Sequence, residues 1–277
     1  MEDKLSRREF FATGAATVVS FSVPSGCTFG RAGVRAPSNN LEEEILIPEG
    51  DFLMGTSEEQ VRQQARSCGY HPAWFAGEMP QRKIHLPSFR IDKYPVTNRR
   101  YAAFCRSTGY RPSCLWGYHP PSLWKDGKVP ETLLDHPVAG VSWADAAEYA
   151  RWAGKSLPTE AQWEKAARGV HGRIFPWGNS FNPKACVWSR SHLGDNQTDS
   201  VFAHPEGASP YGVTDVCGNL AEWCQDGPSD HDSIRFIKGG SWINNSWFFL
   251  RPACRSMGGN KQNDCSFYGF RCVREVG

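Results

Sequence analysis

The sequence predicts an α+β domain that is rich in loops and has short strands and few helices. Among its 277 residues are 27 Gly and 19 Pro, which interrupt regular elements. Long amphipathic runs are scarce, while 11 Trp provide large rings for a core. A helical bundle and a doubly wound sheet both need longer periodic segments, so this composition disfavours both.

The charges disfavour one class of partner. Lys and Arg together number 31 and Asp and Glu 29, which leaves a formal net charge of +2. The sequence also contains no basic stripe with interleaved aromatic residues. We therefore expect no nucleic acid among the partners.

The N-terminus predicts export. Arg7 and Arg8 precede an apolar, uncharged run over residues 12–23, and this pattern resembles a twin-arginine signal. The run is too short for an ordinary transmembrane helix. The stretch that ends at Cys27 resembles a lipobox, although Pro24 stands where an aliphatic residue is usual. Simple cleavage near this point is the alternative to a lipid on Cys27.

The chain divides into three parts. Residues 1–27 carry the signal, residues 28–41 predict a flexible tether, and residues 42–277 are long enough for a single domain. A lipid on Cys27 would attach the tether to a membrane. Because Thr28 stands in place of the Asp associated with inner-membrane retention, we expect a lipoprotein of the outer membrane or cell surface. The alternative is a periplasmic protein without the lipid.

The ten cysteines fit an exported protein, because disulfides persist in oxidising compartments. If Cys27 carries a lipid, nine remain, and at least one thiol is then free or paired between chains. No two cysteines are spaced as C-x-x-C, which disfavours a zinc ribbon. The disulfide connectivity stays open.

Local patterns predict the first elements. A strand, a turn and a second strand are expected over residues 42–55, a long polar excursion with several rings over residues 56–81, and one strand over residues 82–91. Three helices follow, and each begins after a Ser or Thr that caps its N-terminus. They are residues 98–107 after Thr97, residues 143–153 after Ser142 with Asp145 in a capping box, and a helix after Thr159 with Gln162 in a second capping box.

Seven short motifs stand out in this order: residues 94–98, 137–146, 152–164, 175–179, 217–223, 239–242 and 269–271. Taken together they resemble the formylglycine-generating enzyme, or sulfatase-modifying factor, family, and they cover about residues 42–273. A single motif is weak, but the ordered set is specific. The resemblance implies the family's variant of the C-type lectin fold, which is a mixed α+β domain with little regular structure.

The resemblance also implies a catalytic centre that this sequence lacks. The family's enzymes hold a pair of copper-binding cysteines a few residues after the G-G-S-W turn at residues 239–242, since two soft thiolates select Cu(I). The corresponding positions fall within residues 243–249, which contain no cysteine. Cys254 lies further on and has no partner at the family spacing. We therefore expect no formylglycine generation and no catalytic residue.

One cofactor is implied by the resemblance, namely a structural calcium ion. The family's turn G-N-x-x-E-W binds calcium through a carboxylate and backbone carbonyls, and Gly218, Asn219, Leu220 and Glu222 preserve this turn. The alternative for Glu222 is a buried carboxylate paired with an Arg or with backbone amides. A second calcium site of the family is in doubt, because Cys186 stands where the family has Asn.

Residues 243–268, between the G-G-S-W turn and the G-F-R motif, predict a ligand-binding segment. They mix small polar and aromatic residues without a period of 2 or 3.6, a composition typical of recognition surfaces. An ordinary surface loop with a few buried rings is the alternative. The segment resembles the one that variable proteins of diversity-generating retroelements diversify at adenines, and adenine substitution in Asn codons reaches most of its residues.

We expect this segment to contact an unidentified protein or glycan. Its rings would be costly as bare surface, which favours a ligand that covers them. The predicted ligand-binding residues are Ile243, Asn244, Asn245, Ser246, Trp247, Phe248, Phe249, Met257, Gly258, Asn260, Asn263, Asp264, Ser266, Phe267 and Tyr268.

A second hypothesis is an exported enzyme of the same family, such as a maturation enzyme or oxidoreductase without the cysteine pair. Its acid–base groups would be Asp226, Asp230, His231 and Asp232, in the loop before the G-G-S-W turn. Such a run of Asp and His is more often a solvated turn. No Ser-His-Asp order, P-loop or G-x-G-x-x-G motif supports another class of enzyme.

Overall fold

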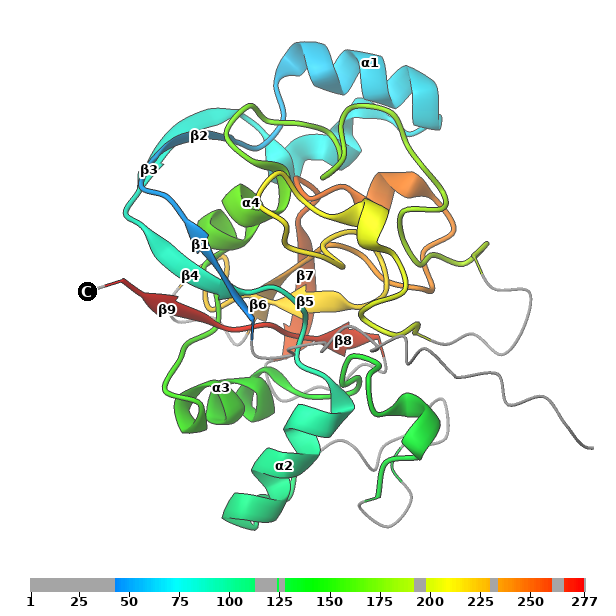
Figure 1. Cartoon of the computed structure of the whole chain (residues 1–277). Helices are drawn as coiled ribbons and strands as arrows, with labels where there is room; N and C mark the ends of the chain where they lie inside the picture. The colour runs from blue at the N-terminus through cyan, green and yellow to red at the C-terminus, as the bar shows by residue number, and fades with distance from the viewer. Residues whose placement is uncertain are drawn as a thin grey trace, which may run out of the picture. The chain divides into compact units, whose positions relative to one another are not determined.

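The computed structural model describes residues 43–112, 124, 128–191, 198–229, 234–260 and 267–276, and every structural statement below concerns these residues (Figure 1). They all belong to one compact unit, Asn40–Gly277. The predicted signal, Cys27 and the predicted tether lie outside the described residues. No helix in the described part of the chain is long and apolar enough to span a membrane.

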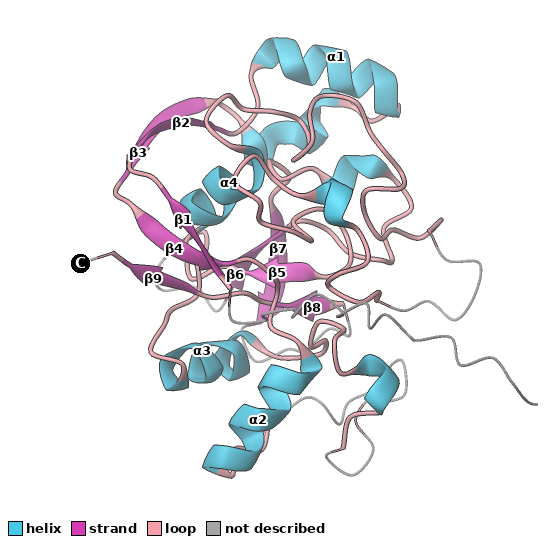
Figure 2. Ribbon diagram, in the orientation of Figure 1, coloured by secondary structure: helices cyan, strands magenta, loops and turns pink. Residues whose placement is uncertain are grey.

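The helices are short, and irregular segments separate them (Figure 2). The α-helices are α1 (Glu58–Cys68), α2 (Asn98–Thr108), α3 (Trp143–Trp152) and α4 (Glu160–Arg168). The 3₁₀ helices are η1 (Pro72–Glu78), η2 (Glu131–Leu133), η3 (Pro205–Gly207) and η4 (Trp247–Leu250).

The strands are also short, and they form three small sheets. The first sheet has the order β1 (Glu44–Ile47), β4 (Phe89–Asp92) and β9 (Val273–Glu275). The second pairs β2 (Gly50–Met54) with β3 (Arg82–Leu86). The third has the order β7 (Ser256–Asn260), β6 (Ile234–Lys238), β5 (Ala221–Trp223) and β8 (Tyr268–Gly269). All pairs are antiparallel except β5 with β8.

The three predicted helix starts are confirmed. Thr97 accepts a hydrogen bond from the backbone of Arg100 at the start of α2. Capping boxes formed by Ser142 with Asp145 and by Thr159 with Gln162 open α3 and α4. Each box satisfies backbone N–H groups that the first turn of a helix leaves without partners, so these starts are encoded locally.

The region before α2 corrects the sequence predictions. Residues 56–81 contain α1, which Ser57 caps in a box with Gln60, and not only an irregular excursion. The expected strand over residues 82–91 divides into β3 and β4, which join different sheets. The break contains Pro87, which has no N–H for a strand ladder. The alternating pattern continued across it and concealed the division.

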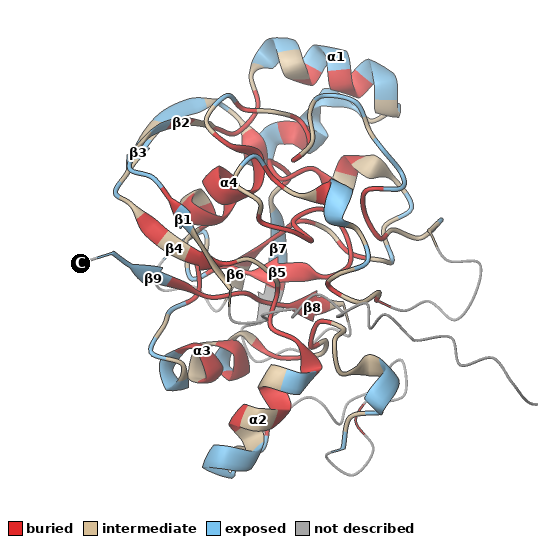
Figure 3. Cartoon of the chain, viewed as in Figure 1, coloured by how far each residue is buried: buried red, intermediate tan, exposed pale blue. Residues whose placement is uncertain are grey.

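The core lies around α4 and around strands β4, β5 and β8, where Figure 3 shows mostly buried residues. Trp163 of α4 and Trp223 of β5 are both fully buried. Each packs into one of the two largest groups of core residues. The predicted α+β class is therefore confirmed. The third sheet places β7 and β8 at opposite edges, and both strands contain residues of the candidate ligand-binding segment.

Candidate functional site

A pocket of about 260 Å³ opens between the loop after the G-G-S-W turn and the third sheet. Its lining includes residues before β7, residues of β7 itself and a residue of β8, so three described stretches of the chain contribute to it. No charged residue lines it within the described part of the chain. The lining residues are Ala221, Ile237, Gly240, Ser241, Ile243, Asn244, Phe249, Cys254, Ser256, Met257, Phe267 and Tyr268.

Six of the predicted ligand-binding residues line this pocket, namely Ile243, Asn244, Phe249, Met257, Phe267 and Tyr268. Met257 is 64% exposed and Ile243 is 48% exposed. Their side chains therefore form exposed apolar surface at the rim of the pocket. Tyr268 is buried and lies edge-on to the ring of Trp223, with 5.0 Å between the ring centroids. It forms part of the floor.

Two predicted contact residues belong to the framework instead. Phe248 is fully buried, where its ring contacts Tyr70 and Phe75. Gly258 lies so close to Trp223 that a Cβ atom there would be 2.2 Å from the indole ring. Packing keeps the Phe248 side chain away from the surface and leaves no room for a side chain at position 258.

The remaining predicted residues do not line the pocket or lie outside the described chain. Asn245 is exposed, Ser246 caps η4 through a hydrogen bond from the backbone of Phe248, and Trp247 packs on Phe175. Asn263, Asp264 and Ser266 lie outside the described residues, and only the backbone of Asn260 is described, at the end of β7.

The turn that enters the segment is held by Asn244. Its Oδ1 accepts a hydrogen bond from the backbone N of Ser241 at 2.7 Å, and its backbone carbonyl accepts one from Ser189 N at 3.1 Å. Gly240 has a φ of +65°, and a Cβ there would lie 2.6 Å from the carbonyl oxygen of Phe249. A tight, glycine-dependent turn therefore brings Phe249 back over the pocket.

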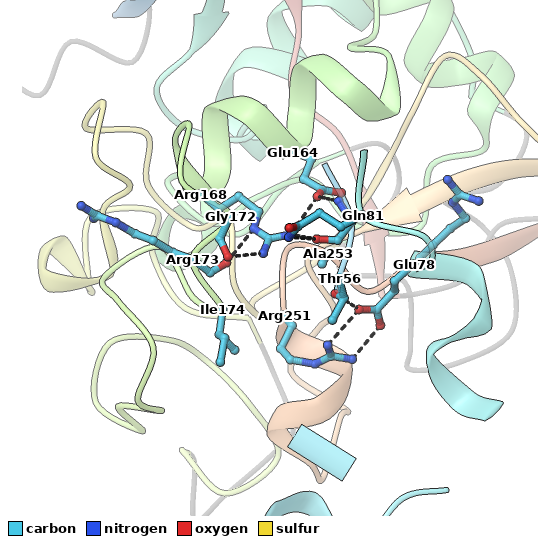
Figure 4. A network of polar contacts seen from close by, with 12 residues as sticks. Thr56, Glu78, Gln81, Glu164, Arg168, Gly172, Arg173, Ile174, Arg251 and Ala253 are labelled. Carbon is cyan, nitrogen blue, oxygen red and sulfur yellow. Dashed lines mark hydrogen bonds and ion pairs between the residues drawn. The ribbon is translucent and has the colours of Figure 1, made fainter. Parts of the chain in front are cut away.

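A buried ion pair fixes the end of this loop (Figure 4). The guanidinium of Arg251 donates to both carboxylate oxygens of Glu78, at 2.7 and 2.9 Å, and to Oε1 of Gln64 at 2.8 Å. Its Nε donates to the backbone carbonyl of Phe248 at 2.9 Å. This bidentate pairing joins η4 to α1 and η1, which the sequence patterns did not connect to the site.

A second buried cation lies at the base of the same loop. Lys238 Nζ donates to Glu164 at 3.0 Å, to Glu160 at 3.3 Å and to the carbonyl of Ala253 at 3.3 Å. Burial opposes its charge, but the two carboxylates outweigh this and raise the pKa of Lys238. Lys238 therefore stays charged and anchors the backbone at Ala253, just before Cys254 of the pocket lining.

Two further rings adjoin the pocket and were missed by the sequence predictions. Tyr70 and Trp74 lie 5.6 and 6.2 Å from the ring of Phe249, between centroids. Trp74 is 58% exposed, so apolar surface continues from the pocket rim onto η1. The rings in the otherwise polar residues 56–81 were the available signal, but nothing local indicated which surface they would join.

Within the described part of the chain, Cys254 contributes the one thiol that lines the pocket, and this thiol is poorly suited to redox chemistry. Burial raises the pKa of Cys254 to about 11, so the protonated form dominates at neutral pH. Among the described residues there is no group of three or more His, Cys, Asp and Glu that could hold a metal ion. A protonated thiol is a poor nucleophile and a poor metal ligand.

The expected calcium turn does not fit the ion through its carboxylate. Both oxygens of Glu222 accept hydrogen bonds from Arg271, each at 2.7 Å, and Oε2 also accepts one from Trp163 Nε1 at 2.8 Å. Arg271 already supplies the positive charge that a cation would bring. Glu222 is thus the buried, Arg-paired carboxylate of the alternative prediction. Leu220 and Asn219 are buried beside it, and Asn219 binds Asp215 and the backbone of Asp199.

The acid–base groups of the enzyme hypothesis gain no support. Asp226 Oδ1 accepts a hydrogen bond from the backbone N of Glu160 at 2.7 Å, at the first residue of α4. Asp226 therefore stabilises the start of a helix, where a carboxylate is favourable. Asp230, His231 and Asp232 lie outside the described residues.

The fold defines the class of protein as a mixed α+β domain with a C-type lectin fold, and solved structures share it. PvdO from Pseudomonas aeruginosa matches with a TM-score of 0.67 and 23% identity, over 84% of this chain and 94% of that one. Treponema denticola variable protein 1 matches with a TM-score of 0.57 and 19% identity, over 83% and 94%. At these identities the likeness shows the fold alone.

Sequence comparison establishes the family. The sulfatase-modifying factor enzyme 1-like domain matches residues 31–276, and the chain belongs to this family. Formylglycine-generating enzyme from Thermomonospora curvata is 30% identical, over 87% of this chain and 96% of the relative. The inactive C-alpha-formylglycine-generating enzyme 2 of Mus musculus is also 30% identical, over 84% and 86%. The family therefore includes both active and inactive relatives.

Proposed function

We propose that this protein binds a protein or glycan ligand through the pocket and the segment around it, and that it does not generate formylglycine. The observation that carries the proposal is the convergence of Ile243, Phe249, Met257 and Phe267 on one uncharged pocket. Among the described residues that line the pocket, Cys254 is the single cysteine. Family membership supplies the scaffold, and the side chains at this place favour recognition over redox chemistry.

The chemistry of the pocket limits what enters it. Its volume of about 260 Å³ is slightly below the range typical of small-molecule sites. One side chain or one sugar ring is the expected inserted group, while the rest of the ligand lies across Ile243, Met257 and Trp74. Exposed apolar residues grouped in this way are typical of interaction sites.

The binding test replaces the rim while leaving the framework intact. We expect the triple variant Ile243→Ser, Met257→Ser, Phe267→Ser to keep its fold and Tm within a few degrees, because none of the three is fully buried. Probed with a glycan array and a phage-displayed peptide library, the wild type should select ligands that the variant loses. Leu46→Ser, at an exposed apolar residue of β1 in another sheet, should retain them.

Two outcomes would overturn the proposal. One is identical ligand selection by the wild type and the triple variant. The other is conversion of a peptide cysteine to formylglycine by the wild-type protein. The DNA downstream gives an independent test of diversification: we expect a near-copy of the stretch encoding residues 239–272, differing mainly at adenines, beside a reverse transcriptase gene.

We further propose that the domain is displayed from a membrane through a lipid on Cys27. The twin-arginine pattern and the lipobox-like residues before Cys27 support this location. Palmitate should label the wild type but not Cys27→Ser, and globomycin should block processing. A wild-type protein that takes up no palmitate and stays soluble in the periplasm would contradict the lipid anchor.

A further inference from the structure

Two cysteines far apart in the sequence meet beneath the candidate ligand-binding segment. Cys186 and Cys217 are both buried free cysteines. They pack in one group with Phe175 and Leu250, against which Trp247 also lies. Leu250 and Trp247 belong to η4, so the thiols lie under the loop that carries Phe249.

The backbone explains why the two thiols face each other. Val187 and Gly218 form a parallel β-bridge, and Asn219 N donates to the carbonyl of Val187 at 2.9 Å. Cys186 and Cys217 each precede one member of this bridge, so they are neighbours in the same register. Neighbouring strands are about 4.8 Å apart, a separation at which the Cα atoms of two cysteines suit a disulfide.

We infer that Cys186 and Cys217 are a cross-linking site, and that they close to a disulfide in an oxidising environment. Two thiols react with a low-molecular-weight disulfide such as oxidised glutathione. One S–S bond of the oxidant breaks, the Cys186–Cys217 S–S bond forms, and two molecules of reduced thiol leave with the protons. The inference does not depend on the proposed function, since it concerns the scaffold of the site.

The surroundings determine when this reaction takes place. Burial raises the pKa of Cys217, and the reactive species is the thiolate. The folded, reduced protein therefore exchanges slowly, whereas a chain that folds in the presence of oxidant closes the bond before the thiols are buried. Once formed, the disulfide is protected from external reductant by the same burial.

The cross-link would stiffen the base of the pocket. Gly218 N donates to the carbonyl of Gly239 at 2.8 Å, and Ser189 N donates to that of Asn244 at 3.1 Å. Each cysteine is thus close in sequence to a residue that holds the G-G-S-W turn. Closing the bond fixes these two supports to each other and leaves the lining of the pocket unchanged.

Peptide mapping tests the inference directly. The full chain is unfolded, refolded in a glutathione redox buffer and blocked with N-ethylmaleimide. It is then digested without reductant by trypsin and a protease that cuts after Glu. Residues 185–190 then contain Cys186 alone, and the cut after Glu222 separates Cys217 from Cys224. We expect a disulfide-linked pair of the peptides 185–190 and 207–222, which reductant separates.

The variants make the result specific. Cys217→Ser should lose the linked peptide and the Tm increase of several degrees that oxidation gives the wild type. Cys224→Ser, which changes a buried cysteine outside the pair, should keep both. Recovery of Cys186 and Cys217 as two alkylated peptides from the refolded wild type would overturn the inference, and so would linkage of either one to a different cysteine.

Discussion

At the scale of single residues, the role of a charged group in this protein depends on how far it is buried and on its hydrogen-bond partners. Asp226 shows this clearly, because the sequence suggested an acid–base group and the structure shows a helix-start acceptor for Glu160 N. Burial raises the pKa of Asp226 above its ordinary value. Asp226 therefore has a structural role, and we expect its titration to affect the free energy of unfolding.

The titration of Asp226 predicts a particular pH dependence. As pH rises from about 4 towards the raised pKa, the unfolded chain loses the Asp226 proton first, so the free energy of unfolding falls over this window. Asp226→Asn keeps an acceptor oxygen for Glu160 N but has no proton to lose. Urea unfolding at a series of pH values measures this. Through this window the free energy of unfolding of the variant should rise relative to that of the wild type.

Glu44 provides a control with the opposite sign. Burial raises its pKa, but Lys155 and Arg274 outweigh burial, and the net pKa of Glu44 is lowered. Its stabilising contribution is present above about pH 4.3 and is lost as pH falls through the lowered pKa. The free energy of unfolding of the wild type should therefore rise relative to that of Glu44→Gln as pH rises. If both variants changed in the same direction relative to the wild type as pH rises, the raised pKa of Asp226 and the lowered pKa of Glu44 would both be contradicted.

At the scale of elements, strand β7 contains both an exposed residue of the pocket and a buried residue of the framework. Met257 and Gly258 are adjacent, yet Met257 is 64% exposed and Gly258 is buried against Trp223. Trp223 is itself fixed, because its Nε1 donates to the carbonyl of Val141 at 2.9 Å. Alternation along a strand places the two residues on opposite faces.

Substitutions in β7 should therefore differ sharply in cost. Gly258→Ala places a methyl group 2.2 Å from the indole of Trp223, and we expect a loss of at least about 2 kcal/mol in the free energy of unfolding. Met257→Ala should cost less than about 1 kcal/mol because the side chain is exposed. Urea unfolding measures both, and equal costs would show that Gly258 tolerates a side chain.

Helix α1 and η1 show where local patterns end. The capping box of Ser57 with Gln60 fits the same rule that predicted α3 and α4, so this helix was within reach of sequence analysis. The contact of α1 and η1 with the candidate site could not be predicted from the sequence. It depends on Arg251, which reaches Glu78 and Gln64 from far along the chain, and no local pattern selects such partners.

At the scale of the whole molecule, Arg271 joins segments that are distant in the sequence. Besides Glu222, its guanidinium donates to the backbone carbonyls of Asp92, Lys93 and Thr214. Removing one partner of such a buried ion pair strongly destabilises the fold, because the other charge would be left buried and unpaired. The pair occupies the place where the family resemblance implied calcium.

The fully paired Glu222 predicts indifference to calcium. Chelation with EDTA should leave the Tm unchanged, and millimolar calcium should not raise it, since no free carboxylate remains on Glu222 for the ion. Terbium luminescence sensitised by tryptophan provides a second readout, and we expect no emission above that of free terbium. A Tm that falls with EDTA and recovers with calcium would contradict this.

Features that depend on neighbours along the chain could be predicted from the sequence. These include the helix starts at Thr97, Ser142 and Thr159, the α+β class and family, and the lack of a cysteine pair within residues 243–249. Capping and motif order are local properties, so they can be predicted without coordinates.

The sequence could not separate the residues of the segment that line the pocket from those that support it, because this depends on tertiary contacts. Phe248 and Phe249 are adjacent and chemically identical, but one is buried and the other lines the pocket. Glu222 pairs with Arg271, and Cys186 meets Cys217, across long stretches of chain. Burial and partners arise from contacts between distant segments, which composition and spacing do not encode.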